Sequence, residues 1–501
     1  MPYSYGNFKA SPNQDEAINH SPSPLMIIAG AGTGKTSTLL HRIRHLILSD
    51  AIESKNTLLL TFTEKATAEA QNTLKSIMGD QADSIFVSTF HSFCHSIMRR
   101  YGSENRLNDV LWDESDTLYY LTSHFDDMDF IQSRAFLENP LNTIRNSFIP
   151  FFGHVSDELL SFNELEEKLN DYEFSQEWTD LNFPGNNLEN TKSDDISFQL
   201  QDLVNAYSFY KKIKAENNAL DFGDMILGCY ELLKSDKSVL RQVRKEYKHI
   251  FIDEYQDNNY ALNKIVNFIM SEKPSITVVG DEDQCIYSFR GANYYNISDF
   301  RNRYKSHEDY AEITLSENRR STQQILDLAN ASINHNPNRT LKELKCPENN
   351  FKNGPKPFWI QATKQETLER LPHLIHALIN NGDALYGDIA VICRGWGNVI
   401  AISDSMQKAA IPVDIHIEKF FDVPIVKNVL SWGHLVVKDH KADVALYRIL
   451  KQQCGEEWTR GFFKSLERTS IDDKIIHLDK IKSESKDITF VMESLSTLQK
   501  A

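Results

Sequence analysis

The sequence predicts an α/β protein with two domains, each built on a parallel sheet, and with helical segments inserted between their parts. Short aliphatic runs that end in small or polar residues recur along the chain, and helix-period stretches separate them. This alternation is typical of parallel sheets with helices on both faces. At 501 residues the chain is also too long for a single ordinary core. We therefore expect three or four compact units.

Five aliphatic runs predict the strands of the first domain. They are residues 25–30, 57–63, 85–90, 249–253 and 276–281. Helix-period stretches such as residues 37–48 and 66–77 lie between them. From residue 101 to 220 the strand signal fades, and an acidic, aromatic-rich segment with helical periodicity interrupts the series. We interpret that segment as an inserted helical subdomain.

A second set of strand-like runs predicts the second α/β domain. It comprises residues 312–315, 357–361, 388–394 and 411–416, with a helical stretch at 365–379. Beyond Pro424 the chain is mainly helical again, and it contains no internal repeat or low-complexity tract that would predict a solenoid.

Charge and cysteine spacing exclude several classes of protein. A net charge of -16 argues against a protein that coats nucleic acid non-specifically, although basic clusters at residues 41–45, 99–100 and 319–320 leave room for a local basic groove. The six cysteines are far apart and form no C-x-x-C pair, so we expect reduced thiols and no zinc site. Without an apolar stretch of membrane-spanning length or a secretory signal, we expect a cytoplasmic protein that makes no membrane contact.

A glycine-rich segment follows the first predicted strand and is typical of a phosphate-binding P-loop. It comprises Ala29, Gly30, Ala31, Gly32, Thr33, Gly34, Lys35 and Thr36, with alanine in the place of the first glycine. Its glycines allow backbone amides to turn around phosphate oxygens as the next helix begins. Lys35 would reach the terminal phosphates of ATP, and the Thr36 hydroxyl would bind Mg²⁺. A glycine-rich turn without a ligand is the alternative interpretation.

Two carboxylates after the fourth predicted strand supply the second half of a nucleotide site. Asp253 is placed to hold Mg²⁺ through water, and Glu254 to orient and deprotonate an attacking water. A solvated acidic loop is the alternative, but the apolar residues that precede Asp253 favour burial beside the P-loop. Phosphoryl transfer also needs positive charge on the transferred group, and Arg320 is the candidate.

In their order and spacing these motifs resemble superfamily 1 DNA helicases of the UvrD/Rep/PcrA type, from about residue 8 to 428. The resemblance implies two RecA-like motor domains, ATP with Mg²⁺ as cofactors, and single-stranded DNA as partner. Gln14, in the segment 11–14, resembles the glutamine that reads the adenine edge. Segments 61–66 and 88–93 resemble motifs Ia and Ib, which lie on the family's DNA track. The DNA-contacting residues implied there are Thr61, Phe62, Thr89 and His91.

Residues 279–292 resemble motif III and are the strongest single match. By that resemblance Gln284 senses the terminal phosphate, Tyr287 and Phe289 stack on bases, and Arg290 contacts the strand. Aromatic faces accept any base, which suits a motor that does not read sequence. Plain core aromatics are the alternative for Tyr287 and Phe289.

Residues 315–321 resemble motif IV, whose arginine acts on the γ-phosphate and here is Arg320. Two positions depart from the family pattern, in which an arginine and a tyrosine sandwich the adenine. Here they hold Ser37 and Arg319, so we expect the Arg319 guanidinium to stack on the base alone. For Arg394, in a segment that resembles the second motor domain, a surface role and a functional role remain open.

Two family motifs are missing from the sequence, namely motif V and motif VI. We therefore expect an N-terminal portion whose second motor domain is incomplete and has an exposed sheet edge. The expected division is motor domain 1A at 1–106 and 219–310, helical subdomain 1B at 107–218, the first part of motor domain 2A at 311–428, and a truncated subdomain 2B at 429–501.

Two functions compete at this point. The first is an ATP-dependent 3'-to-5' DNA helicase or translocase of DNA repair, recombination or replication, which acts on single-stranded DNA and on junctions of single and double strands. The alternative is an ATP- and DNA-binding scaffold that does not unwind and serves a nuclease, repair or phage-defence complex. A P-loop kinase or transporter ATPase is disfavoured, because such enzymes have no use for a base-stacking pair after the phosphate sensor.

Overall fold

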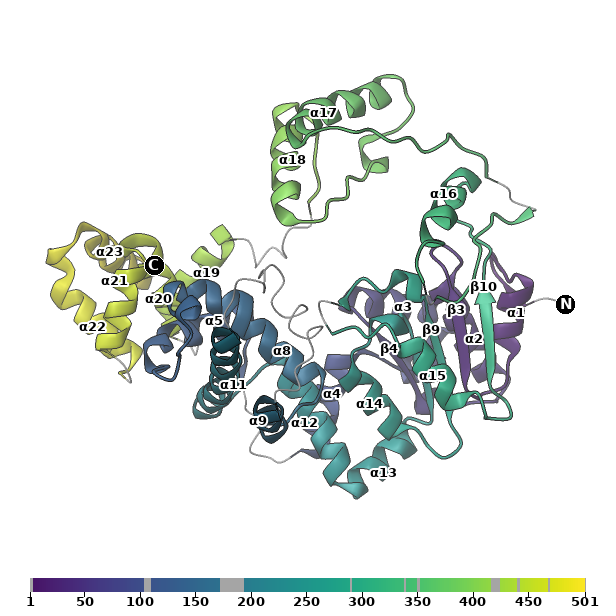
Figure 1. Ribbon diagram of the computed structural model, residues 1–501, viewed down its shortest axis with the longest axis horizontal. Helices are drawn as coiled ribbons and strands as arrows, with labels where there is room; N and C mark the ends of the chain where they lie inside the picture. Colours follow the sequence, from purple (N-terminus) through teal and green to yellow (C-terminus); the bar gives the residue numbers. More distant parts are fainter. Residues whose placement is uncertain are drawn as a thin grey trace. The chain divides into compact units, whose positions relative to one another are not determined.

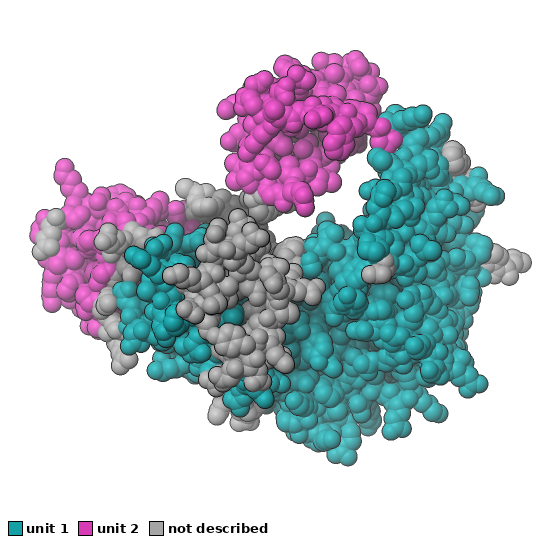
Figure 2. Space-filling view, in the orientation of Figure 1, with its two compact units in different colours: residues 1–356 teal, residues 357–501 magenta. Residues whose placement is uncertain are grey.

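The computed structural model describes residues 3–102, 110–171, 193–288, 291–337, 339–348, 352–415, 424–438, 442–466 and 469–500. The chain divides into two compact units, residues 1–356 and 357–501 (Figure 2). Among the described residues, no helix has the length and the apolar character needed to cross a bilayer. Each unit is described separately below.

A six-stranded parallel sheet forms the centre of the first unit (Figure 1). Its order is β10-β3-β9-β8-β4-β5. The strands are β3 (Leu25–Ala29), β4 (Thr57–Thr61), β5 (Phe86–Thr89), β8 (His249–Ile252), β9 (Ser275–Gly280) and β10 (Ala311–Leu315). The five strands predicted for the first domain are therefore confirmed, and so is the α/β class.

Successive residues of the strands alternate between two hydrophobic clusters. In β3, Met26 and Ile28 belong to one cluster, whereas Leu25 and Ile27 belong to the other. Both faces are apolar because helices cover both of them. Helices α4 (Phe90–Tyr101), α12 (Phe222–Ser235), α13 (Lys237–Glu246), α14 (Tyr260–Ile269) and α15 (Asn296–Tyr304) contribute to the first cluster, and α1 (Pro12–Asn19), α2 (Lys35–Leu48) and α3 (Glu64–Met78) to the second.

Strand β10 corrects one prediction. Residues 312–315 were expected to start the second α/β domain, but β10 pairs with β3, Ile313 opposite Ile27, at the edge of the first sheet. Ile313 and Leu315 are buried in the same cluster as Ile27. The expectation of a separate sheet is wrong here because the apolar face of this strand is covered by the core of the first unit. Helix α16 (Gln323–Ile333) follows.

The predicted insertion is helical and has its own hydrophobic core. Two short parallel strands, β6 (Val110–Leu111) and β7 (Ala219–Leu220), pair where the insertion begins and ends. Its helices are α5 (Glu114–Ser123), α6 (Arg134–Glu138), α7 (Pro140–Thr143), α8 (Ile149–Asp157), α9 (Phe162–Asp171) and α11 (Ser193–Glu216). Phe148, Phe152 and Tyr210 lie at the centre of a cluster formed by residues 112–219. The five-part division of the chain itself stays a prediction.

The second unit is helical in its described residues. Its helices are α17 (Lys364–Asn380), α18 (Trp396–Lys408), α19 (Pro424–Val437), α20 (Ala442–Cys454), α21 (Glu456–Ser465), α22 (Ile471–Ile481) and α23 (Lys486–Lys500). The helix expected at 365–379 is thus confirmed as α17.

The strands expected in the second unit are not formed. Residues 357–361, 388–394 and 411–415 contain no strand in the part of the chain that the structure describes, and His416 lies outside it. Phe358, Trp359 and Ile392 are 75%, 89% and 93% exposed. An extended segment is a strand only when a neighbour pairs with its backbone groups, and these segments pair with none of the described residues.

Candidate functional site

The P-loop lies between β3 and α2, as its sequence predicts. Gly32 and Gly34 have positive φ angles of 72° and 82°, which favour glycine. A Cβ atom on Gly32 would lie 2.6 Å from Asn318 Nδ2 and 2.8 Å from Arg320 Cβ, and one on Gly34 would lie 2.9 Å from Gln14 Nε2. Glycine is required at both positions by conformation and by space, so the loop amides can approach a bound phosphate closely.

Three side chains from three parts of the chain meet at the lysine of this loop. Lys35 Nζ lies 2.6 Å from Glu254 Oε2 and donates to Gln284 Oε1 at 3.2 Å. They come from the residues that follow β3, β8 and β9, which are adjacent in the sheet. The carboxyl ends of parallel strands are where ligands bind in α/β folds. The structure thus brings together three of the five predicted catalytic residues.

Thr36 and Asp253 form the predicted metal pair. Thr36 Oγ1 donates to Asp253 Oδ2 at 2.6 Å. Burial, and then the neighbouring Glu254, raise the pKa of Asp253 to about 6. A hydroxyl and one carboxylate are a donor set that suits Mg²⁺, which keeps several waters and takes its other ligands from the phosphates of its substrate. No group of three or more His, Cys, Asp or Glu side chains suitable for a metal occurs among the described residues.

Glu254 is held in an unusual backbone conformation. Its φ is 50° and its ψ is 47°, in the left-handed region that non-glycine residues rarely occupy. Gln256, which the sequence did not point to, donates from Nε2 to Glu254 Oε2 at 2.9 Å and accepts at Oε1 from the amide of Asp281 at 2.9 Å. Gln256 therefore fixes the carboxylate of Glu254 relative to the end of β9.

Asn318 was also missed as a functional residue. Its side chain is buried and donates from Nδ2 to the carbonyl oxygen of Ala31 at 2.6 Å. Its Oδ1 accepts from the amides of Arg320 and Ser321 at 2.9 and 2.7 Å. This one amide places Arg320 beside the P-loop, although Arg320 belongs to the first unit and not to a second domain as expected.

The candidate adenine-binding residues Gln14 and Arg319 both contact the backbone of the P-loop. Gln14 is buried, donates to the carbonyl oxygen of Thr33 at 3.0 Å and accepts from the amide of Ser11 at 2.9 Å. Arg319 donates from Nη1 to the carbonyl oxygen of Lys9 at 2.9 Å, and its amide donates to Gly32 at 3.0 Å. Ser37 lies half-buried in the first turn of α2. The stacking of Arg319 on adenine stays a prediction.

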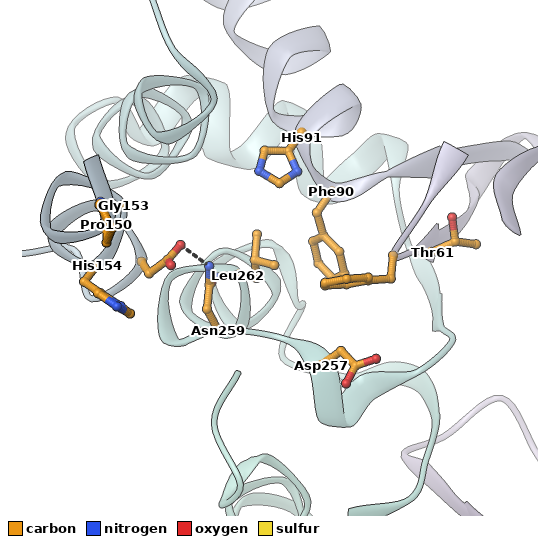
Figure 3. A pocket seen from close by; sticks show the side chains of 11 residues that line it. Thr61, Phe90, His91, Pro150, Gly153, His154, Asp257, Asn259 and Leu262 are labelled. Carbon is orange, nitrogen blue, oxygen red and sulfur yellow. Dashed lines mark hydrogen bonds between the residues drawn. The ribbon is translucent and has the colours of Figure 1, made fainter. Parts of the chain in front are cut away.

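Three of the residues predicted to contact DNA line one cavity (Figure 3). The cavity has a volume of about 360 Å³ and takes residues from the end of β4, from the start of α4, from α8 of the insertion and from α14. It is lined by Thr61, Phe62, Phe90, His91, Pro150, Gly153, His154, Asp157, Asp257, Asn259 and Leu262. Thr89 instead caps α4 and donates to Glu64 Oε1 at 3.0 Å.

The cavity suits bases better than phosphates. Burial lowers the pKa of His91 and of His154, so both imidazoles are neutral at pH near 7 and offer no cation to a phosphate. The Phe62 and Tyr287 rings lie 5.5 Å apart at 33°, so Tyr287, which is predicted to stack on bases, is a neighbour of Phe62, which is predicted to contact DNA. Phe289 and Arg290 lie outside the described residues, so their predicted roles stay predictions.

The comparisons with known proteins agree with this geometry. The family model of the UvrD/REP helicase N-terminal domain matches residues 10–305, and that of the UvrD-like helicase C-terminal domain matches residues 313–491. The ATP-dependent DNA helicase PcrA of Staphylococcus aureus is 30% identical over 441 residues, and that of Staphylococcus epidermidis is 29% identical over 444 residues. Each match covers 87% of this chain and 55% of the relative.

The chain therefore spans about half the length of the curated relatives it matches. The matches confirm the predicted family. Both of its domains, for which RecA-like α/β folds were predicted, have matching segments in this chain. Because the first of these domains alone matches more than half of the chain, this protein belongs to the UvrD/REP helicase family.

Proposed function

We propose that the protein is an ATP-dependent DNA helicase or translocase whose hydrolysis of ATP is stimulated by single-stranded DNA. The observation that carries the proposal is the convergence of Glu254 and Gln284 on Lys35, at 2.6 and 3.2 Å from its Nζ, at the ends of adjacent parallel strands. The same motif III segment that supplies Gln284 to the nucleotide site supplies Tyr287 to Phe62. A movement of Gln284 would therefore displace Tyr287, three residues along the chain, relative to Phe62.

The residues have distinct tasks in hydrolysis. The P-loop amides and Lys35 bind the β- and γ-phosphates, while Thr36 and Asp253 hold the Mg²⁺ that neutralises them. When Lys35 turns to the phosphates, the carboxylate of Glu254 is released from its ion pair and can accept a proton from the attacking water. Arg320 stabilises the charge that develops on the transferred phosphoryl group.

DNA would occupy the cavity beside the end of β4 and the start of α4. A base that enters it meets the side chains of Phe62 and His91 and the wall formed by α8 of the insertion. Stacking on aromatic side chains contributes about 1–3 kcal/mol per base and is tolerant of sequence. This tolerance fits a motor that moves along DNA of any sequence.

Several finer statements belong to the same proposal and rest on the resemblance of the motifs. They are the 3'-to-5' direction, action at junctions of single and double strands, a role in DNA repair, recombination or replication, a cytoplasmic location, and an association with a nuclease or repair protein. The binding of adenine by Gln14, Ser37 and Arg319 belongs here as well.

The test is the rate of ATP hydrolysis with and without single-stranded DNA, with Lys35→Ala and Glu254→Gln as inactive controls. We expect stimulation by DNA in the wild type and about a hundredfold loss or more in both variants. Unwinding is measured separately on duplexes with a 3' or a 5' single-stranded tail. An ATPase that ignores DNA would contradict the motor function, and unwinding only from 5' tails would contradict the direction.

A second candidate is favoured by the second unit. Three apolar segments there contain no strand, and Trp359 and Ile392 are exposed. A scaffold that binds ATP and DNA but does not unwind would fit this arrangement. It predicts that fluorescent ATP and single-stranded DNA both bind to the 501-residue chain while neither tailed duplex is unwound.

A further inference from the structure

A run of three acidic residues lies between β9 and the candidate phosphate sensor Gln284. The side chains of Asp281 and Asp283 are only 3% and 10% exposed. Two ionised carboxylates this close together are strongly unfavourable in an interior unless cations pair with them. The resemblance to motif III assigns a role to Gln284 but gives no reason for burying the carboxylates of Asp281 and Asp283.

One later segment, residues 339–345, supplies both cations. Lys342 Nζ lies 2.7 Å from Asp281 Oδ1 and 2.5 Å from Asp283 Oδ2. Arg339 binds Asp283 with two parallel hydrogen bonds, at 2.8 Å from Nε and 2.6 Å from Nη2. The side chains of Lys342 and Arg339 are 2% and 4% exposed. These ion pairs are therefore buried in the interior and are not solvent-exposed surface contacts.

Asp281 connects Lys342 to the nucleotide site. Its Oδ2 accepts a hydrogen bond from Gln284 Nε2 at 2.5 Å, while its Oδ1 binds the lysine. An amide has one donor end and one acceptor end, so fixing Nε2 on Asp281 directs Oε1 away from it. That oxygen accepts from Lys35 Nζ at 3.2 Å. The orientation of the phosphate sensor is thus set through Asp281.

The same segment also touches the P-loop and motif IV. A Cβ atom on Gly30 would lie 2.5 Å from the side chain of Leu344, and the amide of Asn318 donates to the carbonyl oxygen of Lys345 at 2.8 Å. Arg339 pairs with Asp283, whereas Lys342 pairs with both Asp283 and Asp281. Lys342 therefore supplies the counter-charge of the carboxylate that holds Gln284.

We propose that Lys342 is a positioning residue for ATP hydrolysis, which acts through Asp281 to hold the amide oxygen of Gln284 on Lys35, the lysine proposed to bind the terminal phosphates. The inference rests on the ATPase activity proposed above. It adds a residue outside the helicase motifs, on a segment that contacts both sides of the nucleotide site. Removal of its charge should impair the chemical step more than the binding of nucleotide.

The test compares Lys342→Met, Gln284→Ala and the two combined. Steady-state kcat and KM for ATP are measured with saturating single-stranded DNA, and Kd is measured for a fluorescent ADP with and without aluminium fluoride, which mimics the transferred phosphoryl group. We expect Lys342→Met to lower kcat about tenfold or more, to change KM and the Kd for ADP by less than about threefold, and to abolish the tightening by aluminium fluoride. The double variant should be no slower than Gln284→Ala alone.

Two further variants separate positioning from stability. Lys342→Arg keeps the charge and should recover kcat to within about threefold of the wild type. Lys345→Met removes an exposed lysine of the same segment, paired with Glu343 at 2.9 Å, and should change nothing. If Lys342→Met does not fold, Asp281→Asn takes its place and must show the same non-additive loss with Gln284→Ala.

Additive losses in the double variant, or a normal kcat in Lys342→Met, would overturn the proposal. So would a loss of ADP affinity as large as the loss of kcat. A wild type without ATPase activity would contradict the proposed function instead, and the aluminium fluoride measurement would still decide the role of Lys342.

Discussion

Asn318 Nδ2 donates to the carbonyl oxygen of Ala31 at 2.6 Å, across 287 residues of sequence, and so joins the turn after β10 to the middle of the P-loop. The same side chain accepts from two backbone amides of its own turn, one of them that of Arg320. The side-chain amide of Asn318 therefore ties the turn after β10 to the P-loop. This arrangement leads to the first of five predictions.

Asn318→Ala should weaken the binding of fluorescent ATP about tenfold and lower kcat as well, because three part-buried hydrogen bonds are lost and Arg320 is no longer held. The matched control is Asn13→Ala, which removes an exposed asparagine that donates to the carbonyl oxygen of Thr314 in β10 at 2.7 Å. Both affinities come from equilibrium titration. Equal effects of the two substitutions would show that Asn318 has no special role.

Gly32→Ala should abolish nucleotide binding. The φ of 72° already disfavours alanine, and the new Cβ would also collide with Asn318 and Arg320. Gly382→Ala is the control, since its φ is 75° but nothing lies within 4 Å of the added atom. It should cost only about 1 kcal/mol of stability and leave ATP binding intact. Retained binding by Gly32→Ala would contradict the geometry of the loop.

Arg319→Ala should weaken ATP binding about three- to tenfold, because the guanidinium would no longer stack on adenine. Arg370→Ala is the control, since this exposed arginine only pairs with Glu366 one helical turn away. Affinity for ATP is compared with affinity for free triphosphate, which lacks a base. A loss shared equally by both ligands would assign Arg319 to the phosphates, and unchanged ATP affinity would remove it from the site.

Asp253→Asn should stabilise the metal-free protein while it abolishes hydrolysis. Burial raises the pKa of Asp253 in the folded state to about 6, from an ordinary value of 3.8. Between these values the folded state binds more protons than the unfolded state, so the contribution of Asp253 to stability falls as pH rises through this window and is lost above pH 6.

The gain from Asp253→Asn should therefore reach about 3 kcal/mol near pH 8 and fall below about 1 kcal/mol near pH 4. Urea unfolding in EDTA at both pH values measures it. Asp50→Asn, at an exposed position, is the matched control. A gain of the same size at both pH values would rule out the burial of charge as its cause.

Phe62→Ala should weaken the binding of single-stranded DNA about tenfold and leave ATP hydrolysis without DNA unchanged, because it removes one ring of the aromatic pair with Tyr287. Tyr295→Ala removes an aromatic ring that is 66% exposed and lies outside the cavity. It should not affect DNA affinity. Fluorescence anisotropy with a labelled oligonucleotide measures both, and unchanged affinity in Phe62→Ala would exclude this cavity as the DNA track.

The strands of the first sheet could be predicted because each is a short apolar run, buried on both faces. The assignment of β10 failed for a reason that local sequence does not carry. The run at 312–315 looks the same whether it pairs with β3 or starts a new sheet, and only its neighbour decides. The runs at 357–361 and 388–394 failed likewise, since their composition is strand-like but no described neighbour pairs with them.

The sequence predicted roles for residues within the motifs. It predicted none for the residues that hold the motif side chains in place. Lys35, Glu254 and Gln284 carry a spacing that indicates their tasks. Gln256 and Lys342 both bind Asp281, which is distant from each of them in the sequence and is brought to them by the fold. A buried glutamine or lysine has no signature in a single sequence, because its partner is defined in space.

Gln256 makes the site depend on one uncharged amide. Its Nε2 donates a hydrogen bond to Glu254 Oε2 and its Oε1 accepts one from the backbone amide of Asp281, both at 2.9 Å. Gln256→Glu would exchange the amide nitrogen for an oxygen and set a second carboxylate against that of Glu254. A single atom that no motif residue contributes would then decide whether the carboxylate of Glu254 keeps its place.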